Sequence, residues 1–202
     1  MTILRSSPAS PFGRKVKLAA AILGLSETIT IVQTDTINPD EPFLADNPLG
    51  KIPVLIPDGG KPIYDSPVIL EYLDLQAGGG KIIPAAPEAR IAALTLQALA
   101  DGIADAALLR VYESRLRAEE HRSKAWDDTQ AGKIARGLAY LETNTPSATG
   151  ALTVGEITVA CALGYLDLRF GGTWRAAHPR LVAFLDAFAA RVPAFEATRV
   201  KT

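Results

Sequence analysis

The sequence predicts two domains, a mixed α/β domain followed by an all-helical one. Eleven of the 14 prolines lie at or before Pro87, whereas 27 of the 33 alanines lie after Pro84. Proline punctuates strands and turns, and alanine is the strongest helix former. A segment rich in Gly and Pro lies where the composition changes. We therefore expect an α/β domain over 1–77, a linker over 78–87 and a helical domain over 88–202.

Composition also excludes several classes of protein. The 202 residues include 21 Lys and Arg against 22 Asp and Glu, a near-neutral balance that argues against non-specific nucleic-acid binding. The single cysteine, Cys161, can form neither a disulfide framework nor a Cys-based zinc site. Charged residues or Gly interrupt the apolar runs before they reach the roughly 20 residues of a membrane span, and the N-terminus does not resemble a secretory signal. We expect a cytoplasmic protein without nucleic-acid or membrane partners.

The first half of the chain predicts a β-α-β unit. A strand over 2–5 leads into a helix over 11–24, whose apolar residues recur at helical spacing with Lys15 and Lys17 outward. The alternating, β-branched segment 28–33 predicts the second strand. Such a unit needs parallel strands joined by a crossover helix.

A polar loop with two prolines follows, and a β-β-α unit comes after it. Residues 53–56 and 62–64 flank Asp58-Gly59-Gly60, a sequence typical of a tight hairpin. Ser66 predicts the N-cap of the next helix, with Pro67 in the first helical position. A sheet of this order with helices packed on it is similar to the thioredoxin fold.

The second half predicts four helices and nothing else. Their expected extents are 88 to about 117, 128–143, a helix that starts after Thr153, and 178–191. Thr153-Val154-Gly155-Glu156 predicts a capping box, in which a Thr hydroxyl and a Glu carboxylate accept hydrogen bonds from each other's backbone N–H groups.

Three patches of the first half could carry chemistry. Ser10 before Pro11 is either a structural N-cap or a hydroxyl that stabilises an anion at a helix N-terminus. Pro53 either caps a sheet edge or follows a cis bond that turns the backbone of Ile52 toward an extended peptide. The pair at 65–66 either caps a helix or holds an α-amino acid group by its carboxylate and ammonium.

In this order and spacing the patches resemble the cytosolic glutathione S-transferase superfamily, over nearly the whole chain. Ser-Pro-Phe-x-x-Lys-Val at 10–16 resembles the start of serine-type members, and Asn-Pro-x-Gly-Lys-Ile-Pro-Val-Leu at 47–55 resembles their cis-proline segment. Asp-Ser at 65–66 is similar to the pair that binds the γ-glutamyl group, and the Thr153 motif to the family's helical capping box. Ala-Asp-Gly-Ile-x-Asp-Ala at 100–106 resembles small bacterial transferase-like proteins.

The resemblance implies a glutathione site in the first domain, with glutathione as co-substrate and no metal. The residues that it assigns to glutathione are Phe12, Lys51, Ile52, Pro53, Asp65 and Ser66; Lys51 has a solvated surface lysine as its alternative. Ser10 would donate a hydrogen bond to the thiolate, with Ser7 as the alternative donor. A free thiol with a pKa of about 8.5 is only about 3% ionised at pH 7. A hydrogen bond to the thiolate would therefore raise the ionised fraction.

In the second domain the resemblance implies two further sites. Asp101 would reach glutathione across a homodimer, and Tyr112, Arg115 and Trp174 would line the second-substrate site, although aromatic residues at helical spacing are usually core. The leading hypothesis is a detoxifying transferase that joins glutathione to an electrophilic small molecule. Glutathione-dependent reduction of peroxides or disulfides and a non-catalytic binding or interaction module are the alternatives.

Overall fold

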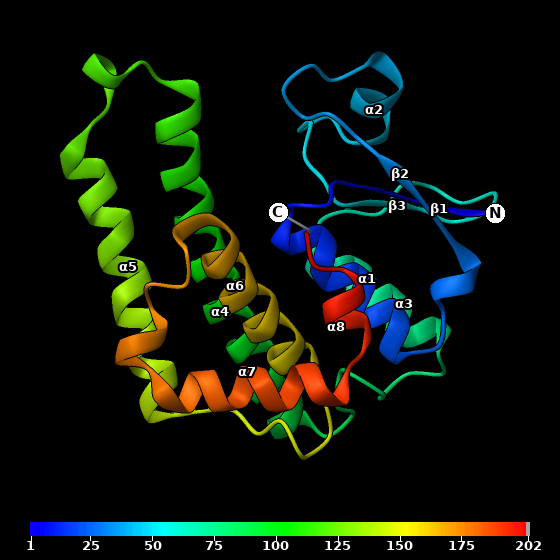
Figure 1. The fold of residues 1–202 in the computed structure, drawn as a ribbon. Coiled ribbons are helices and arrows are strands. Elements are labelled where there is room, and N and C mark those ends of the chain that lie inside the picture. The colour runs from blue at the N-terminus through cyan, green and yellow to red at the C-terminus, as the bar shows by residue number, and fades with distance from the viewer. Residues whose placement is uncertain (201–202) are drawn as a thin grey trace. The chain divides into compact units, whose positions relative to one another are not determined.

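The computed structural model describes residues 1–200, which form two compact units (Figure 1). The first unit holds Met1–Ala93 together with the segment from Val192 onward, and the second holds Leu94–Arg191. The first is a small sheet with helices and the second is all-helical, so the predicted fold class is confirmed.

The sheet has three strands, β1 (Thr2–Ser6), β2 (Ile29–Gln33) and β3 (Val54–Ile56), in the order β2-β1-β3. β1 runs parallel to β2, as the β-α-β unit requires, and antiparallel to β3. The predicted fourth strand over 62–64 is reduced to an isolated bridge between Leu55 and Ile63.

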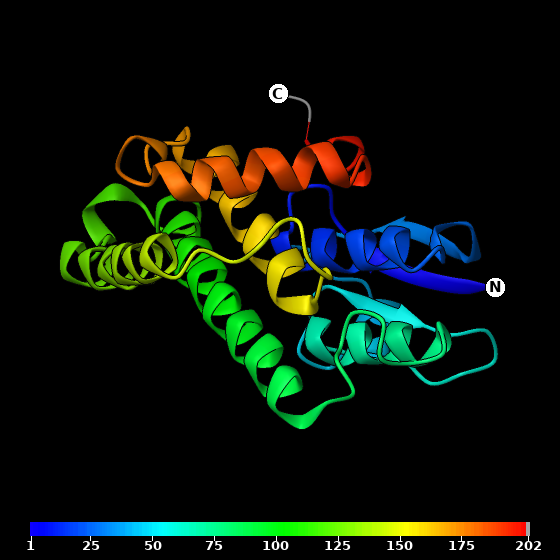
Figure 2. The ribbon, with the colours of Figure 1, turned by 90° about the horizontal axis from the view of Figure 1, so that it is seen from below.

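Two helices pack against each other beside the sheet, α1 (Pro11–Ile22) and α3 (Ser66–Gln76) (Figure 2). Each helix buries an apolar face, and the side chains of these two faces form one core with the buried side chains of the strands. The fully buried apolar side chains of this core include Leu4, Val16, Leu18, Val54, Leu55, Ile69 and Leu70.

The expected outward position of Lys15 on α1 is wrong, because its side chain is 0% exposed. Its Nζ atom lies 6.0 Å from the centre of the Phe12 ring. α1 is enclosed on more than one side, since α8 (Ala194–Ala197) also packs on it. There Arg14 lies 4.0 Å from the centre of the Phe195 ring and donates to the Phe195 carbonyl. Helical periodicity in the sequence predicts a single buried face, so it does not identify a helix that is covered on more than one side.

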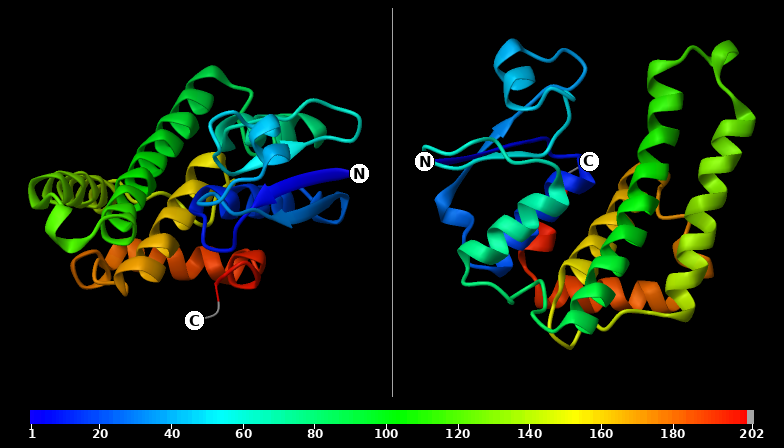
Figure 3. Two further views of the ribbon diagram at one scale, coloured as in Figure 1. Left: turned by 90° about the horizontal axis from the view of Figure 1, so that it is seen from above. Right: turned by 180° about the vertical axis from the view of Figure 1, so that it is seen from behind.

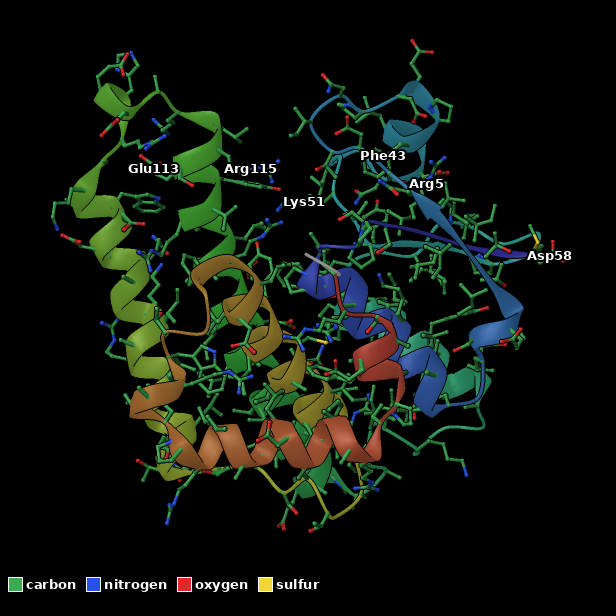
Figure 4. The ribbon with its side chains drawn as sticks, in the orientation of Figure 1. Arg5, Phe43, Lys51, Asp58, Glu113 and Arg115 are labelled. Atoms are coloured by element: carbon green, nitrogen blue, oxygen red, sulfur yellow. The ribbon has the colours of Figure 1, made fainter. Side chains whose placement is uncertain are left out.

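The segment predicted as a polar loop contains a short helix, α2 (Glu41–Asp46). The Asp40 carboxylate caps it by accepting from the Phe43 N–H at 2.8 Å, and Phe43 is buried. Arg5 of β1 donates to Asp46 at 2.6 Å, and its guanidinium lies 5.8 Å from the centre of the Phe43 ring. Figure 4 shows Arg5 and Phe43 together where α2 meets the sheet.

The glycine-rich segment after α3 is an ordered part of the first unit. The buried Asp74 carboxylate accepts hydrogen bonds from the N–H groups of Gly80, Lys81 and Ile82 at 2.8, 2.9 and 2.7 Å. Ile82 and Ile83 are themselves buried. The Ile83 N–H adds a weaker bond at 3.4 Å, so one carboxylate holds four successive N–H groups of the segment between α3 and α4.

The second unit consists of four long helices, and α4 and α5 form an antiparallel hairpin (Figure 3). They are α4 (Pro87–Leu116), α5 (Lys124–Thr143), α6 (Val154–Phe170) and α7 (Pro179–Arg191). α5 begins earlier than predicted because Ser123 caps it, accepting from the Trp126 N–H at 3.3 Å. The predicted capping box is confirmed: Thr153 Oγ1 accepts from Gly155 N–H at 3.1 Å, and Glu156 accepts from Thr153 N–H at 2.8 Å.

Among residues 1–200, α4 alone is long and apolar enough to cross a membrane by length and composition, which differs from the expectation that no stretch is. Core helices of soluble proteins satisfy the same criterion. α4 is such a helix in part, because Ala100, Ile103 and Ala107 are buried in the second unit.

Candidate functional site

The register of the sheet brings the first two sequence patches together. Arg5 near the end of β1 pairs with Val54 at the start of β3. When this antiparallel register is extended by two residues, the pair at 52–53 lies beside residues 6–7, which lead to the start of α1. The cis-proline segment and the serine loop therefore share one edge of the sheet.

The third patch reaches the same edge through the bridge between Leu55 and Ile63. Their backbones exchange two hydrogen bonds, of 3.0 and 2.7 Å. The same extension aligns residues 65–66 with 52–53, on the side away from β1. All three patches thus meet where two helices, α1 and α3, begin, and both helix N-termini supply partly free N–H groups.

Ser10 is the N-cap of α1, and its Oγ atom accepts from the Gly13 N–H at 3.1 Å. A hydroxyl can accept one hydrogen bond and still donate another. The half-buried Ser10 can therefore cap the helix and donate its proton to an anion at the same time. The structural and functional interpretations of this residue are compatible.

Gly13 allows Ser6 to pack directly on the first turn of α1. A Cβ atom at position 13 would lie 2.1 Å from Ser6 Oγ, so only glycine fits there while Ser6 keeps its place. Ser6 is completely buried and is thereby removed from contact with a ligand. Ser7 is half-buried like Ser10, and its carbonyl oxygen accepts weakly from Ser10 N–H at 3.4 Å.

Asn47 organises the loop before the cis proline, and the sequence interpretation gave it no role of its own. Its buried side chain donates to the Lys51 carbonyl at 2.8 Å and accepts from the Leu49 N–H at 3.1 Å. Gly50 completes the turn with a φ of 60°, which favours glycine. The signal was present in the sequence, because Asn followed by Pro and Gly is typical of such turns.

Ile52 follows this loop, and the Ile52–Pro53 peptide bond is cis, as the resemblance implies. Among residues 1–200, no hydrogen bond engages the backbone N–H or C=O of Ile52. Pro53 is buried, whereas Ile52 is half-buried. A polar backbone unit thus lies unpaired at the sheet edge, where an extended peptide could pair with it.

The N-cap of α3 is Asp65, so the assignment of Ser66 to that position is wrong. Asp and Ser are equally good N-caps, and here the first of the two takes the position. Ser66 becomes the first helical residue and is 2% exposed. Within residues 1–200, the exposed Asp65 carboxylate and the Ser66 hydroxyl have no hydrogen-bond partner.

The other predicted ligand contacts of the first unit lie close in sequence to this edge. Phe12 is a half-buried residue in the first turn of α1. Lys51 is exposed and extends away from the sheet (Figure 4), and no carboxylate of the described chain pairs with it. In the second unit, Asp101 is half-buried on α4.

The three predicted second-substrate residues differ in exposure. Tyr112 is 38% exposed and Arg115 is exposed, both near the end of α4. Figure 4 shows Arg115 on the side of α4 away from α5, whereas Glu113 faces α5. Trp174 is only 6% exposed, and its indole N–H donates to Asp167 at 2.9 Å. Its ring therefore offers less surface to a ligand than Tyr112 does.

A thioredoxin-like unit with a cis proline, joined to an all-helical unit, is the architecture of a glutathione transferase. Residues 9–76 match the family model of the glutathione S-transferase N-terminal domain, and residues 97–187 match that of the C-terminal domain. The chain belongs to the glutathione S-transferase family.

Relatives of known structure and sequence cover nearly the whole chain. A glutathione transferase family member from Pseudomonas fluorescens Pf-5, solved with bound glutathione, is 42% identical with a TM-score of 0.94 and full coverage of both chains. A structure with bound S-(propanoic acid)-glutathione, also from that organism, is 41% identical with a TM-score of 0.88 and full coverage of both. The uncharacterized GST-like protein YibF of Escherichia coli K12 is 33% identical over 91% of each chain.

Proposed function

We propose that the chain is a serine-type glutathione transferase that binds glutathione at the edge of its N-terminal sheet, stabilises the thiolate and joins it to an electrophilic small molecule. The observation that carries this proposal is the meeting of the three sequence patches at one sheet edge. The Pseudomonas relatives, solved with glutathione and with a glutathione thioether, support the same ligand.

The backbone of glutathione pairs with Ile52. The cysteinyl residue of the tripeptide has one N–H and one C=O, and Ile52 offers the complementary unpaired groups. Lys51 lies next to this position and supplies a cation for a carboxylate of the ligand. Asn47 acts through Lys51 as a positioning residue, since it holds the Lys51 carbonyl in place.

The γ-glutamyl end binds at the start of α3. The Ser66 hydroxyl and the free N–H groups of the first turn donate to the α-carboxylate, which the positive end of the helix dipole also favours. The Asp65 carboxylate accepts from the ammonium group. Both residues lack partners within the described chain and are therefore available for these contacts.

Ser10 donates a hydrogen bond to the thiolate sulfur. A hydrogen bond to a charged group is worth roughly 1.5–3 kcal/mol, which lowers a thiol pKa by about one to two units. The thiolate sulfur then attacks an electrophilic carbon. With an aryl halide, the new C–S bond replaces the C–halogen bond, and halide leaves with the bonding electrons.

Conjugation is favoured over a dithiol reductase mechanism by the position of the sulfur atoms in the protein. The helix N-terminus at the site carries the hydroxyl of Ser10. The single cysteine, Cys161, is buried within α6 of the other unit. The reactive sulfur of the proposed reaction is therefore that of the ligand.

The test measures glutathione affinity, the pKa of the bound thiol and turnover of 1-chloro-2,4-dinitrobenzene. Ser10→Ala should raise the thiol pKa by about one to two units and lower kcat, while Ser7→Ala should change neither. The reverse pattern would assign the role to Ser7. Absence of glutathione binding at millimolar concentration would refute the proposal in favour of a non-catalytic module.

We further propose a cytoplasmic homodimer in which Asp101 of one subunit contacts the γ-glutamyl ammonium bound to the other. Sedimentation velocity tests the dimer. If the dimer contact exists, Asp101→Asn should weaken glutathione binding while the sedimentation coefficient stays that of a dimer. A monomeric wild-type protein with full glutathione affinity would contradict this assignment.

A further inference from the structure

Two arginines near the ends of α4 and α6 have no acidic partner among residues 1–200, Arg115 and Arg169. Three other arginines of the second unit are neutralised by ion pairs, whereas Arg122, Arg136, Arg180 and Arg191 form none within the described chain. These pairs are Arg110 with Asp127, Arg117 with Glu113, and Arg175 with Asp167. The positive charges of Arg115 and Arg169 are thus left uncompensated within the described chain.

The helices that carry the two arginines run side by side in the same direction. Near their beginnings, a Cβ atom on Gly155 of α6 would lie 2.8 Å from Leu96 of α4. Near their ends, the Arg110 guanidinium of α4 lies 5.0 Å from the centre of the Phe170 ring of α6. The two contacts are separated by similar numbers of residues on each helix, so the last turn of α6 lies beside α4 at Arg110, and α4 continues past it for more than one turn (Figure 1).

Tyr165 lies on α6 one turn before Arg169 and is 3% exposed. The Arg169 guanidinium lies 5.6 Å from the centre of its ring and is near enough to its hydroxyl to act on it electrostatically. Arg115 and Tyr112 of α4 are also near enough to act on this hydroxyl electrostatically. Burial raises the pKa of Tyr165, so the phenol stays neutral at physiological pH and does not cancel the charge of Arg169.

Arg169 also has an unsatisfied donor. Its Nε atom is buried without a hydrogen-bond partner in the described chain. A buried donor without a partner is costly, and a bound oxygen atom would remove that cost. The guanidinium group is also the side chain that best matches the two oxygens of a carboxylate.

We propose that Arg115 and Arg169 form an anion site that receives the carboxylate of the electrophilic substrate. The half-exposed ring of Tyr112 supplies an aromatic surface beside it. The substrate class is then a small aromatic or unsaturated carboxylic acid with an electrophilic carbon. Tyr165 is a positioning residue, because its ring packs against the Arg169 guanidinium. The inference about the substrate rests on the proposed transferase function, whereas the anion site itself does not.

The first arm of the test measures binding without reaction. Isothermal titration of the full-length protein compares 3-nitrobenzoate with 3-nitrobenzamide, which differ only in the carboxylate. We expect the benzoate to bind about tenfold more tightly, a difference of about 1.4 kcal/mol. Arg115→Gln and Arg169→Gln should each remove most of this preference. Arg136→Gln is the matched control, since Arg136 is an exposed arginine of α5 that forms no ion pair in the described chain.

Equal affinities of the two ligands for the wild-type protein would overturn the anion site. A preference that survives Arg115→Gln, or that Arg136→Gln removes equally, would overturn the assignment of the residues. Arg115 is exposed, so its variant keeps the test decisive where Arg169→Gln fails to fold.

The second arm measures kcat/KM for 4-chloro-3-nitrobenzoate and 4-chloro-3-nitrobenzamide, each divided by its uncatalysed rate with glutathione. A lower KM for the acid that is lost in Arg115→Gln supports the substrate class. Preferential binding of the benzoate without turnover of either halide would overturn the transferase function and leave the anion site standing. Turnover without a preference in either arm would overturn the anion site alone.

Discussion

The side-chain amide of Asn47 donates a hydrogen bond to the carbonyl oxygen of Lys51 at 2.8 Å. This bond closes the loop that leads to Ile52, while the Asn47 carbonyl oxygen holds Leu49 N–H at 3.1 Å. The backbone that we propose as the partner of glutathione is therefore positioned by a residue that does not itself contact the ligand.

Asn47→Ala should weaken glutathione binding, because Lys51 and Ile52 lose the anchor that holds their backbone. The loss of two hydrogen bonds in a buried position should also lower the free energy of unfolding by about 1–3 kcal/mol. Calorimetric titration and urea denaturation measure the two effects. Asn47→Asp keeps the acceptor for Leu49 and loses the donor to Lys51, so it separates the two bonds. Unchanged glutathione affinity in both variants would contradict the positioning role.

Gly13→Ala should destabilise the protein, because the new Cβ atom would meet Ser6 Oγ at 2.1 Å. The expected cost is about 1–3 kcal/mol, typical of overpacking. In a Ser6→Ala background the closest atom is gone, so the same substitution should cost less. A double-mutant cycle by urea denaturation measures this coupling, which we expect to exceed 0.5 kcal/mol in magnitude. Additive effects would show that the two side chains do not compete for the same space.

Asp74→Ala should loosen the segment between α3 and α4. Four N–H groups that donate to this buried carboxylate would lose their acceptor. We expect a loss of about 2–4 kcal/mol in the free energy of unfolding, since hydrogen bonds to charged groups are the stronger ones. Hydrogen exchange should quicken at residues 80–82. Glu71→Ala is a suitable control, because the Glu71–Arg90 ion pair of the same region is largely exposed.

Because Tyr165 is buried, we expect the folded protein to lose stability at high pH. Burial raises its pKa in the folded protein above the value of about 10 in the unfolded chain. Below pH 10 both states hold the proton, and above it the unfolded state releases the proton first, so the folded state loses stability as the pH rises. Tyr165→Phe should make this decline shallower by up to about 1.4 kcal/mol per pH unit. The exposed Tyr140 supplies the control, Tyr140→Phe, and an equal effect of both variants would contradict the prediction.

The sequence predicted those features of the fold that depend on local signals. The strands of the β-α-β unit, the helical half and the capping box at Thr153 all follow from short patterns, and all are present. The cis bond before Pro53 was implied by the family resemblance. Their contacts lie within a few residues of one another or within one repeating face, so a linear pattern contains the information.

The features that the sequence missed depend on contacts between distant segments. Lys15 is buried in part because α1 is enclosed from several directions, including the C-terminal helix α8, more than 170 residues away. The helix α2 was hidden by two prolines, Pro39 just before it and Pro42 in its first turn, although Asp40 is a good N-cap for it. Asp65 and Ser66 compete for one capping position with similar preferences, and only the backbone decides between them.

The three patches of the candidate site could be predicted from the sequence. What brings them together in space could not. They are brought together by the register of β1, β3 and the bridge at Ile63, which a single sequence does not specify. The unpaired arginines near the ends of α4 and α6 were likewise beyond the sequence alone. Arg115 was singled out, but its isolation from carboxylates and the nearby Arg169 emerge only from the fold.

The return of the C-terminal segment to α1 has a consequence for the synthesis of the protein. Arg14 of the first helix binds the Phe195 carbonyl and ring, so the N-terminal unit uses residues that are translated after the whole of the second unit. Domains generally fold in the order of their translation. Here the unit that is translated first is completed only after the second unit has been translated, and a nascent chain stalled before residue 192 would expose the surface of α1 that α8 covers.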